Sequence, residues 1–362
     1  MVTHYPFPVA AHTYFHALNK HSQKRDFLAG LIEQPEFTYN PYWTSGLIES
    51  RLKMTQGDLF ATQRLEVVLA SLRLRKNSNE LEAFRAANSS IFHVPTRELA
   101  EAVLGRMLRN VTQENMHLWK EVLELLKTDV FKDISVAPNE ETFQKYREYL
   151  LQYTTLPEIN ENLEDALREQ LVRTGLADDG WELNVKDGAM HAQTVHRRKT
   201  ISIGRDYKPR SASAVRRITI HEVIGHAKRG PQHTLEESEG FAIVLEQLTK
   251  STFIFRRSYR YLAVALGWGV FGKPMNFREV YEVMWRLMVI QSKYSIENAK
   301  EHAFDECYRA FRGGRPDIAG AVFLKDTVYL DANIRMWTVL NTSELSYNEF
   351  VDSIEGRRTI LS

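Results

Sequence analysis

The stretch ITIHEVIGHAKRGPQHTLEESEGFA, residues 218–242, contains two histidines and a glutamate in an order that indicates a metal site on a helix. His221 and Glu222 are adjacent, and His226 follows His221 by five positions. Residues five apart on a regular α-helix point about 140° away from each other, so the two imidazoles could not face one ion. A π-helical turn absorbs one extra residue, and such turns are frequent at functional sites. We therefore expect a locally widened helix, in which Gly225 accepts the strained backbone.

A catalytic zinc ion needs three protein ligands and one open position for water. His221 and His226 supply two ligands, and Glu239 on the next expected helix supplies a carboxylate as the third. Gly240 beside it would let that helix approach the first one closely. Glu222 would face the open position, where it can take a proton from water and pass it to a leaving amine. The opposing interpretation is a buried histidine pair beside a carboxylate on the helix surface.

The flanking sequence predicts a mostly helical α+β protein. Before residue 177, apolar residues recur at helical spacing in two stripes that we expect in the core: Leu65, Val68, Leu69 and Leu72, and Leu118, Val122, Leu125 and Leu126. Residues 34–43 have two prolines and four aromatic residues, which favours an extended segment. We therefore expect a helical N-terminal region, residues 1–176, packed on a catalytic domain, residues 177–362.

The second half of the chain is expected to contain a small sheet and several helices. Two or three strands are indicated by apolar residues at alternate positions: Trp181, Leu183 and Val185, and then Ile201 and Ile203. Ser211 or Ser213 is a plausible N-cap for the histidine helix, which would end near Arg229 before Gly230 and Pro231. A second helix should begin near Thr234, further helices should fill residues 255–311, and residues 321–330 should form a strand or a loop.

Composition limits the possible functions. The 362 residues include 47 basic and 46 acidic side chains, so no overall charge attracts the chain to nucleic acid or anionic lipid. No apolar run approaches the roughly 20 residues that span a bilayer, and the N-terminal stretch does not have the pattern of a signal peptide. Cys307 is the single cysteine, which excludes an internal disulfide and favours a reducing compartment, the cytoplasm.

These motifs resemble the microtubule-associated tyrosine carboxypeptidase family, whose bacterial members are labelled flavohaemoglobin expression-modulating QEGLA-motif proteins. That family has H-E-x-x-x-H followed by an E-E-G-L-A or Q-E-G-L-A helix, matched here by His221 to His226 and by SEGFA, residues 238–242. PEFTYNPY and RAFRGGRPDIAGAVFLKDTVYL resemble two further blocks, so the resemblance covers roughly residues 30–340. It implies a gluzincin-like zinc metallopeptidase acting on peptide or protein C-termini, with a possible preference for an aromatic, tyrosine-like residue.

A carboxypeptidase also needs a cation for the substrate carboxylate and a donor for the oxyanion. The C-terminal block offers Arg312, in a glycine-flanked loop, with Lys325 and Arg309 as further cations, and Tyr329 as the oxyanion donor. The alternative is that these residues pair with neighbouring acids and hold the last helices together.

Two other interpretations stay open. HEVIGH also resembles H-E-x-x-G-H of the dipeptidyl-peptidase III family, in which case Glu237 would be the third ligand in place of Glu239, although the chain is much shorter than that family. A non-catalytic regulator could also keep a metal site for stability while it binds a protein partner.

Overall fold

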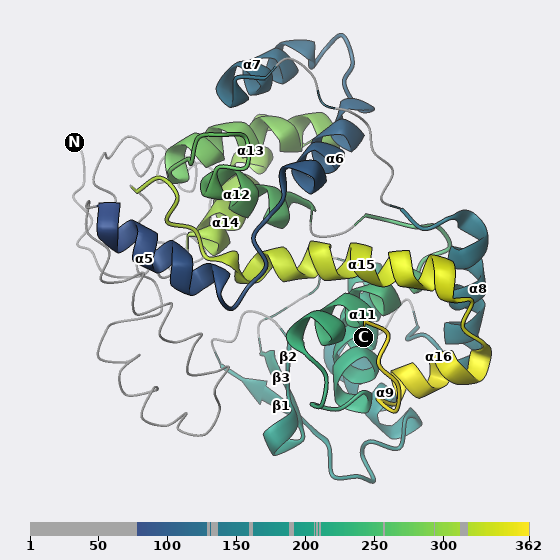
Figure 1. Ribbon diagram of the computed structural model, residues 1–362. Helices are drawn as coiled ribbons and strands as arrows, with labels where there is room; N and C mark the ends of the chain where they lie inside the picture. The colour runs from purple at the N-terminus through teal and green to yellow at the C-terminus, as the bar shows by residue number, and fades with distance from the viewer. Residues whose placement is uncertain are drawn as a thin grey trace. The chain divides into compact units, whose positions relative to one another are not determined.

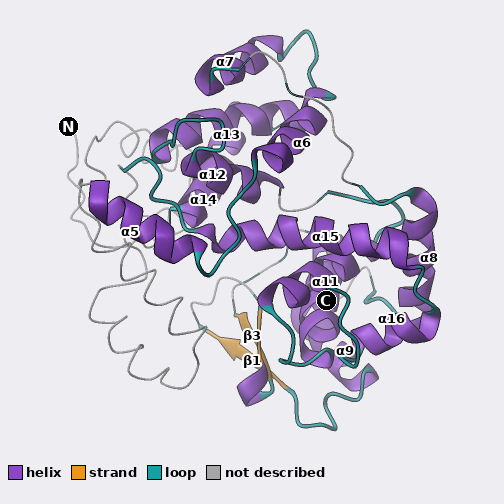
Figure 2. Cartoon of the chain, in the orientation of Figure 1, coloured by secondary structure: helices purple, strands orange, loops and turns teal. Residues whose placement is uncertain are grey.

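The protein is mostly helical with one small three-stranded sheet, as Figure 2 shows, and this confirms the expected mostly helical α+β class. The computed structural model describes residues 78–128, 131, 137–158, 162–187, 192–205, 207, 209, 211–255, 258–292, 294–311 and 318–361. The expected stripe between Leu65 and Leu72 and the extended segment 34–43 lie outside the described residues.

The chain divides into two compact units (Figure 1). Unit 1 comprises the described residues of 78–135 and 258–327, and unit 2 comprises those of 136–257 and 328–362. This division differs from the expected boundary after residue 176, because residues 136–176 pack with the sheet and the histidine helix, whereas residues 258–327 pack with the earlier helices.

Unit 1 is helical in its described part. Its elements are α5 (Ser78–Ser89), α6 (Arg97–Leu108), α7 (Met116–Leu126), α12 (Ser258–Trp268), α13 (Phe277–Ser292), α14 (Ile296–Ala310) and a 3-10 helix (Leu324–Thr327). In α7, the predicted stripe is buried at Leu118, Val122 and Leu126, whereas Leu125 is 39% exposed. Asn88 ties α5 to the segment before the 3-10 helix, since its amide donates to Val322 O (2.7 Å) and accepts from Leu324 N (3.2 Å).

Unit 2 contains the histidines. Its elements are α8 (Glu140–Tyr153), α9 (Leu163–Arg173), β1 (Glu182–Lys186), β2 (Gln193–Val195), a 3-10 helix (His196–Arg198), β3 (Thr200–Gly204), α10 (Ala212–Thr219), a π-helix (Ile220–Lys228), α11 (Leu235–Leu248), α15 (Val328–Ser343) and α16 (Tyr347–Ile354). The strand order is β1-β3-β2, with β1 parallel and β2 antiparallel to β3. The short β2 is therefore an edge strand of this sheet.

The expected N-cap of the histidine helix is Ser211, and the second helix begins where it was expected, with Thr234 as its N-cap. The Ser211 hydroxyl accepts from Ala214 N at the start of α10, and the Thr234 hydroxyl accepts from Glu237 N at the start of α11. Each cap satisfies a backbone N–H that has no partner within its helix. Residues 321–330, left open as strand or loop, form a loop, the 3-10 helix and the first turn of α15.

The π-helix lies between the sheet and α11, and α15 packs across α11 (Figure 1). Ile220, Val223 and Ile224 point into the unit 2 core, where they join Phe241 of α11 and Trp337 of α15. A buried amide network adds specificity to the contact between α11 and α15: Gln247 and Asn333 exchange two hydrogen bonds of 3.0 and 3.1 Å, and Trp337 Nε1 donates to Gln247 Oε1 at 2.7 Å. The histidine helix is thus held on both sides by packed elements.

In the described part of the chain, no helix is both long and apolar enough to cross a membrane.

Candidate metal centre

The histidine helix is π-helical from Ile220 to Lys228, which confirms the predicted widening. It follows α10 directly, so one continuous helix changes from α to π geometry just before His221. Hydrogen bonds from residue i to i+5 bring residues five apart to the same side. His221 and His226 consequently face each other, with their Nε2 atoms 3.0 Å apart.

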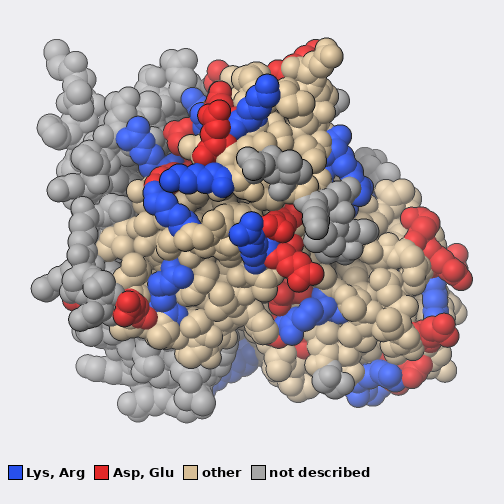
Figure 3. Space-filling model, turned by 45° about the horizontal axis from the view of Figure 1, so that its top comes forward, with Lys and Arg blue, Asp and Glu red and all other residues tan. Residues whose placement is uncertain are grey.

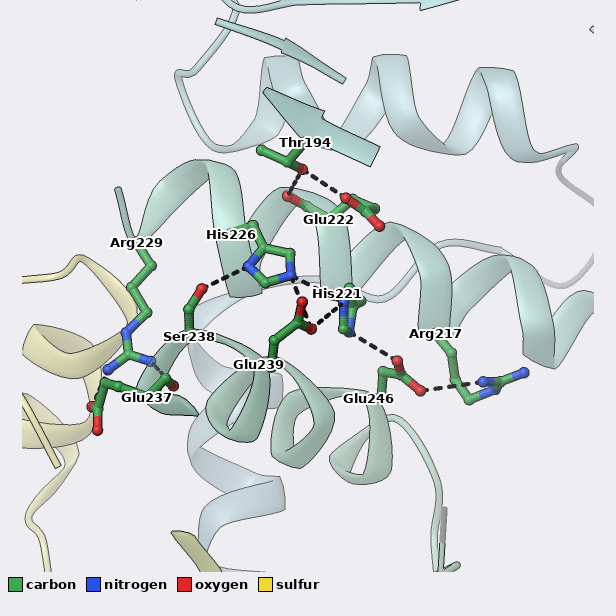
Figure 4. A network of polar contacts seen from close by, with 10 residues as sticks. All are labelled: Thr194, Arg217, His221, Glu222, His226, Arg229, Glu237, Ser238, Glu239 and Glu246. Carbon is green, nitrogen blue, oxygen red and sulfur yellow. Dashed lines mark hydrogen bonds and ion pairs between the residues drawn. The ribbon is translucent and has the colours of Figure 1, made fainter. Parts of the chain in front are cut away.

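Glu239 completes a three-residue group with the two histidines (Figure 4). Its Oε2 lies 3.6 Å from His221 Nε2 and 3.7 Å from His226 Nε2, and the three side chains are only 11–14% exposed. Tetrahedral ligands bound to one zinc ion at 2.0–2.1 Å would be separated by about 3.3 Å. The three atoms are close to that spacing, so this group could hold a metal ion.

The other nitrogen of each imidazole is also held. His221 Nδ1 lies 2.8 Å from Glu246 Oε1, and His226 Nδ1 lies 2.9 Å from Ser238 Oγ. A carboxylate only accepts hydrogen bonds, so Glu246 favours the tautomer of His221 with the proton on Nδ1 and the lone pair on Nε2. Metal-binding histidines characteristically have such a partner on the second nitrogen, because it fixes the ring and raises its basicity.

The electrostatics around His221 favour a positive charge. Burial by itself would lower the pKa of this imidazole, but Glu246 in particular, together with Glu222 and Glu239, raises it to about 9. Arg217 Nη1 lies 3.2 Å from Glu246 Oε2 and balances one of these carboxylates. The remaining negative charge suits a cation bound between the histidines.

Glu222 is largely buried and lies on the same helix as the two histidines. Thr194 of β2 holds it: the Thr194 hydroxyl lies 2.7 Å from Glu222 Oε2 and 3.0 Å from Glu222 O (Figure 4). These contacts link the edge of the sheet to the first turn of the π-helix. The sequence-based assignment of Glu222 as the base beside the metal is compatible with this position.

The carboxylate of Glu237, the alternative third ligand, makes its hydrogen bonds outside the histidine group. Its Oε1 accepts from the guanidinium of Arg229 and from Ile360 N (2.8 Å), and its Oε2 accepts from Leu361 N (2.7 Å). Arg229 is also fully buried, which lowers its pKa while Glu237 opposes this effect, and its guanidinium lies 4.5 Å from the centre of the Phe241 ring. Glu237 therefore neutralises a buried cation and anchors the C-terminal segment.

Two glycines act differently from our expectation. Gly225 does not have a positive φ; a Cβ at this position would lie 2.6 Å from Ala242 Cβ and 2.9 Å from Ala242 Cα. Gly225 is therefore needed for the close approach of α11 to the π-helix, not for a strained backbone. Gly240 faces α15 instead of the π-helix, since its Cβ would meet Ala332 O at 2.8 Å. Glu239 is thus followed by two residues that contact the neighbouring helices: Gly240 contacts α15 and Ala242 contacts the π-helix.

We expect Gly225→Ala to destabilise the protein by about 1–3 kcal/mol, because overpacking at this crossing forces the two backbones apart. Urea unfolding in the presence of a chelator measures this change without a contribution from bound metal. The double variant Gly225→Ala/Ala242→Gly should recover only part of the loss, since the Cβ is removed but the Ala242 Cα remains 2.9 Å away. A wild-type free energy of unfolding for Gly225→Ala would contradict the assigned packing role.

The residues expected to bind substrate fall in several parts of the chain. Arg312 lies outside the described residues. Arg309 of α14 and Lys325 of the 3-10 helix belong to unit 1, where Arg309 Nε lies 3.6 Å from the fully buried Asp326 Oδ2. Tyr329 is partly exposed in the first turn of α15, in unit 2, three residues before the Ala332 that touches Gly240. Among the expected site residues that the structure describes, His221, His226 and Glu239 form one group.

Four polar residues of the centre were absent from the sequence-based set: Thr194, Arg217, Ser238 and Glu246. Glu246 follows Glu239 by seven residues, which is nearly two helical turns, so it lies on the same face of α11. That spacing could have indicated it. Thr194 is 28 residues from Glu222 and reaches it only through the fold, so the sequence gives no comparable signal for Thr194.

Comparison of the chain with protein-family models, curated protein sequences and solved structures gives no match.

Proposed function

We propose that the protein is a zinc metallopeptidase of the carboxypeptidase type, with His221, His226 and Glu239 as the zinc ligands and Glu222 as the general base. One observation carries the proposal: two imidazole Nε2 atoms of the π-helix and a carboxylate oxygen of α11 converge within 3.7 Å in a largely buried site. Glu222 directly follows the first of these histidines. Two histidines and one carboxylate are the donor set of a common class of catalytic zinc sites.

Zinc at this position would polarise the substrate carbonyl and lower the pKa of a bound water. The residues of the chain supply the remaining functions. Glu222 accepts a proton from the attacking water at a carboxylate oxygen and delivers it to the leaving amine nitrogen, so the carboxylate is regenerated in each cycle. Glu246 and Ser238 hold the imidazoles in the orientation that directs both Nε2 lone pairs to one point.

The choice of a carboxypeptidase, with a peptide or protein C-terminus as substrate, comes from the sequence resemblance. A carboxypeptidase needs a cation for the substrate carboxylate and a donor for the oxyanion, and on that ground we assign Arg312, with Lys325 and Arg309, to the carboxylate and Tyr329 to the oxyanion. The face drawn in Figure 3 has basic and acidic side chains interspersed, in line with the balanced charge of the chain, so the proposed recognition depends on individual cations. The single cysteine favours a reducing compartment such as the cytoplasm.

The direct test is hydrolysis of a peptide library with varied C-terminal residues, read by mass spectrometry. Protein loaded with zinc should release C-terminal residues, and the same protein treated with a chelator should not. Restoration by added zinc excludes irreversible damage by the chelator. A zinc-loaded protein that leaves every peptide intact would contradict the peptidase assignment and favour the non-catalytic regulator, in which the metal contributes only stability.

Amidation of the substrate C-terminus should reduce turnover about ten- to a hundredfold. A free carboxylate gains a charge-assisted contact with an arginine of roughly 1.5–3 kcal/mol that an amide cannot make, and about 1.36 kcal/mol corresponds to a factor of ten. Acetylation of the N-terminus should have little effect. Equal cleavage of acid and amide peptides, or a requirement for a free N-terminus, would exclude the carboxypeptidase while the zinc hydrolase remained.

The dipeptidyl-peptidase III-like alternative is less well supported. It needs Glu237 as the zinc ligand, but both oxygens of that carboxylate accept backbone hydrogen bonds from the C-terminal segment, and Oε1 also binds Arg229. The regulator is separated from the enzyme by activity at equal zinc occupancy, because both would bind the metal.

A further inference from the structure

Thr194 makes the hydrogen bond that fixes Glu222. In the part of the chain that the structure describes, it is the only hydrogen-bond partner of the Glu222 carboxylate, with a distance of 2.7 Å to Oε2. The same hydroxyl lies 3.0 Å from Glu222 O. One side chain of the sheet therefore contacts both the backbone and the carboxylate of the proposed base.

The hydroxyl itself has a fixed position. Thr194 is the middle residue of β2 and is paired with Ile201 of β3. A β-branched side chain in a strand also has restricted rotation about its first side-chain bond. The sheet thus presents the hydroxyl at one point, whereas a glutamate has three rotatable side-chain bonds and can leave its site without such a partner.

The position of a general base matters because it must lie within hydrogen-bond reach of the proton that it takes. A displacement of about 1 Å at a reacting group can reduce the rate a hundredfold. The π-helix determines where the backbone of Glu222 lies, but not which way its carboxylate turns. We propose that Thr194 is the positioning residue that orients the Glu222 carboxylate for proton transfer, an inference that rests on the proposed peptidase function.

The contact between Thr194 and Glu222 Oε2 suits a base that carries a proton for part of each cycle. The hydroxyl has one proton and can donate to only one acceptor at a time. When the carboxylate is ionised, Thr194 donates to Oε2. When Glu222 takes a proton from water on Oε1, Oε2 becomes the carbonyl oxygen of the acid and can still accept from Thr194, so the proton on Oε1 remains available to the leaving amine. Thr194 gains and loses no proton, and Glu222 keeps its place in both forms.

The test compares Thr194→Val with Thr194→Ser in the full chain loaded with zinc. Valine keeps the branched shape without the hydroxyl, and serine keeps the hydroxyl. We expect kcat of Thr194→Val to fall about ten- to a hundredfold with KM changed less than about twofold, because only the chemical step loses orientation. Thr194→Ser should stay within about threefold of wild type, and zinc content should remain about one ion per chain in both variants. Equal kcat in the two variants would overturn the positioning role.

Crystal structures of the two variants give a readout that does not depend on activity. The Glu222 carboxylate should leave its position in Thr194→Val and keep it in Thr194→Ser. An unmoved carboxylate in Thr194→Val would contradict the inference even if the protein is a peptidase. If wild-type protein hydrolyses no peptide, the proposed function fails, and the position of Glu222 in these structures still decides whether Thr194 orients it.

Discussion

Glu222→Gln is expected to reduce peptide turnover about a hundred- to ten-thousandfold while the protein keeps its zinc. Glutamine has the same shape as glutamate, and its amide oxygen can still accept from Thr194, so the variant should fold normally. Its amide cannot take a proton from water, so the proposed general base is lost. The measurement is kcat on a cleaved peptide at equal zinc occupancy, with zinc determined by mass spectrometry.

Glu236→Gln is the matched control for this substitution. Glu236 is a glutamate of the first turn of α11 that pairs with Arg335 at 2.5 Å, and it is not one of the three residues of the candidate metal centre. Its replacement should leave kcat within about twofold, as is usual for partly exposed ion pairs. If Glu222→Gln and Glu236→Gln have equal activity, Glu222 is not the base, and activity that is also independent of zinc would point to a contaminating peptidase.

The part of the centre that lies within one segment was predictable from the sequence. The interval of five between His221 and His226 is incompatible with one metal on an α-helix, so a functional reading of the two residues required a widened helix. The helix limits were also encoded locally, because Ser211 and Thr234 cap the first turns of their own helices. Local geometry determines both features, and no distant residue has to be known.

Contacts between segments that are far apart in the sequence were harder to predict from it. The sequence indicated that Gly240 allows a close approach between helices, but not that Gly240 faces Ala332 and that Gly225 is the glycine that faces Ala242. Thr194 reaches Glu222 only because β2 pairs with β3 and the sheet packs on the π-helix. The two compact units differ from the expected boundary after residue 176 for the same reason: helical periodicity identifies a helix but does not say which core it joins.

Glu237 is the clearest example of a residue whose role could not be assigned from the sequence alone. SEG in residues 238–240 and EES in residues 236–238 place two candidate ligands within one helical turn, and residue type cannot distinguish them. The distinction depends on the orientation of α11: Glu239 faces the histidines, whereas Glu237 faces Arg229 and the backbone of residues 360 and 361. This assignment predicts different effects for the two carboxylates: loss of Glu239 should weaken zinc binding, and loss of Glu237 should lower the stability of the fold.

Glu239→Ala should weaken zinc binding by more than about a hundredfold, because even the partners of zinc ligands contribute 10- to 100-fold. Glu237→Ala should instead lower the free energy of unfolding by about 3–5 kcal/mol, since it leaves the buried Arg229 without its carboxylate. Zinc affinity is measured by competition with a chromophoric chelator, and stability by urea unfolding.

Unfolding must be measured with a chelator present, because zinc bound to the native state adds stability of its own. Under these conditions Glu239→Ala should stay within about 1 kcal/mol of wild type, since only its metal-binding role is removed.

Glu237→Gln provides a milder variant in case Glu237→Ala does not fold. It keeps the side-chain shape and loses the charge opposite Arg229, and it should keep zinc affinity within about tenfold while the protein is folded. The reverse pattern, with zinc lost in Glu237→Gln and kept in Glu239→Ala, would make Glu237 the ligand and revive the dipeptidyl-peptidase III comparison. The proposed pattern requires that metal affinity and stability depend on different glutamates two residues apart, which a single disruption of α11 could not produce.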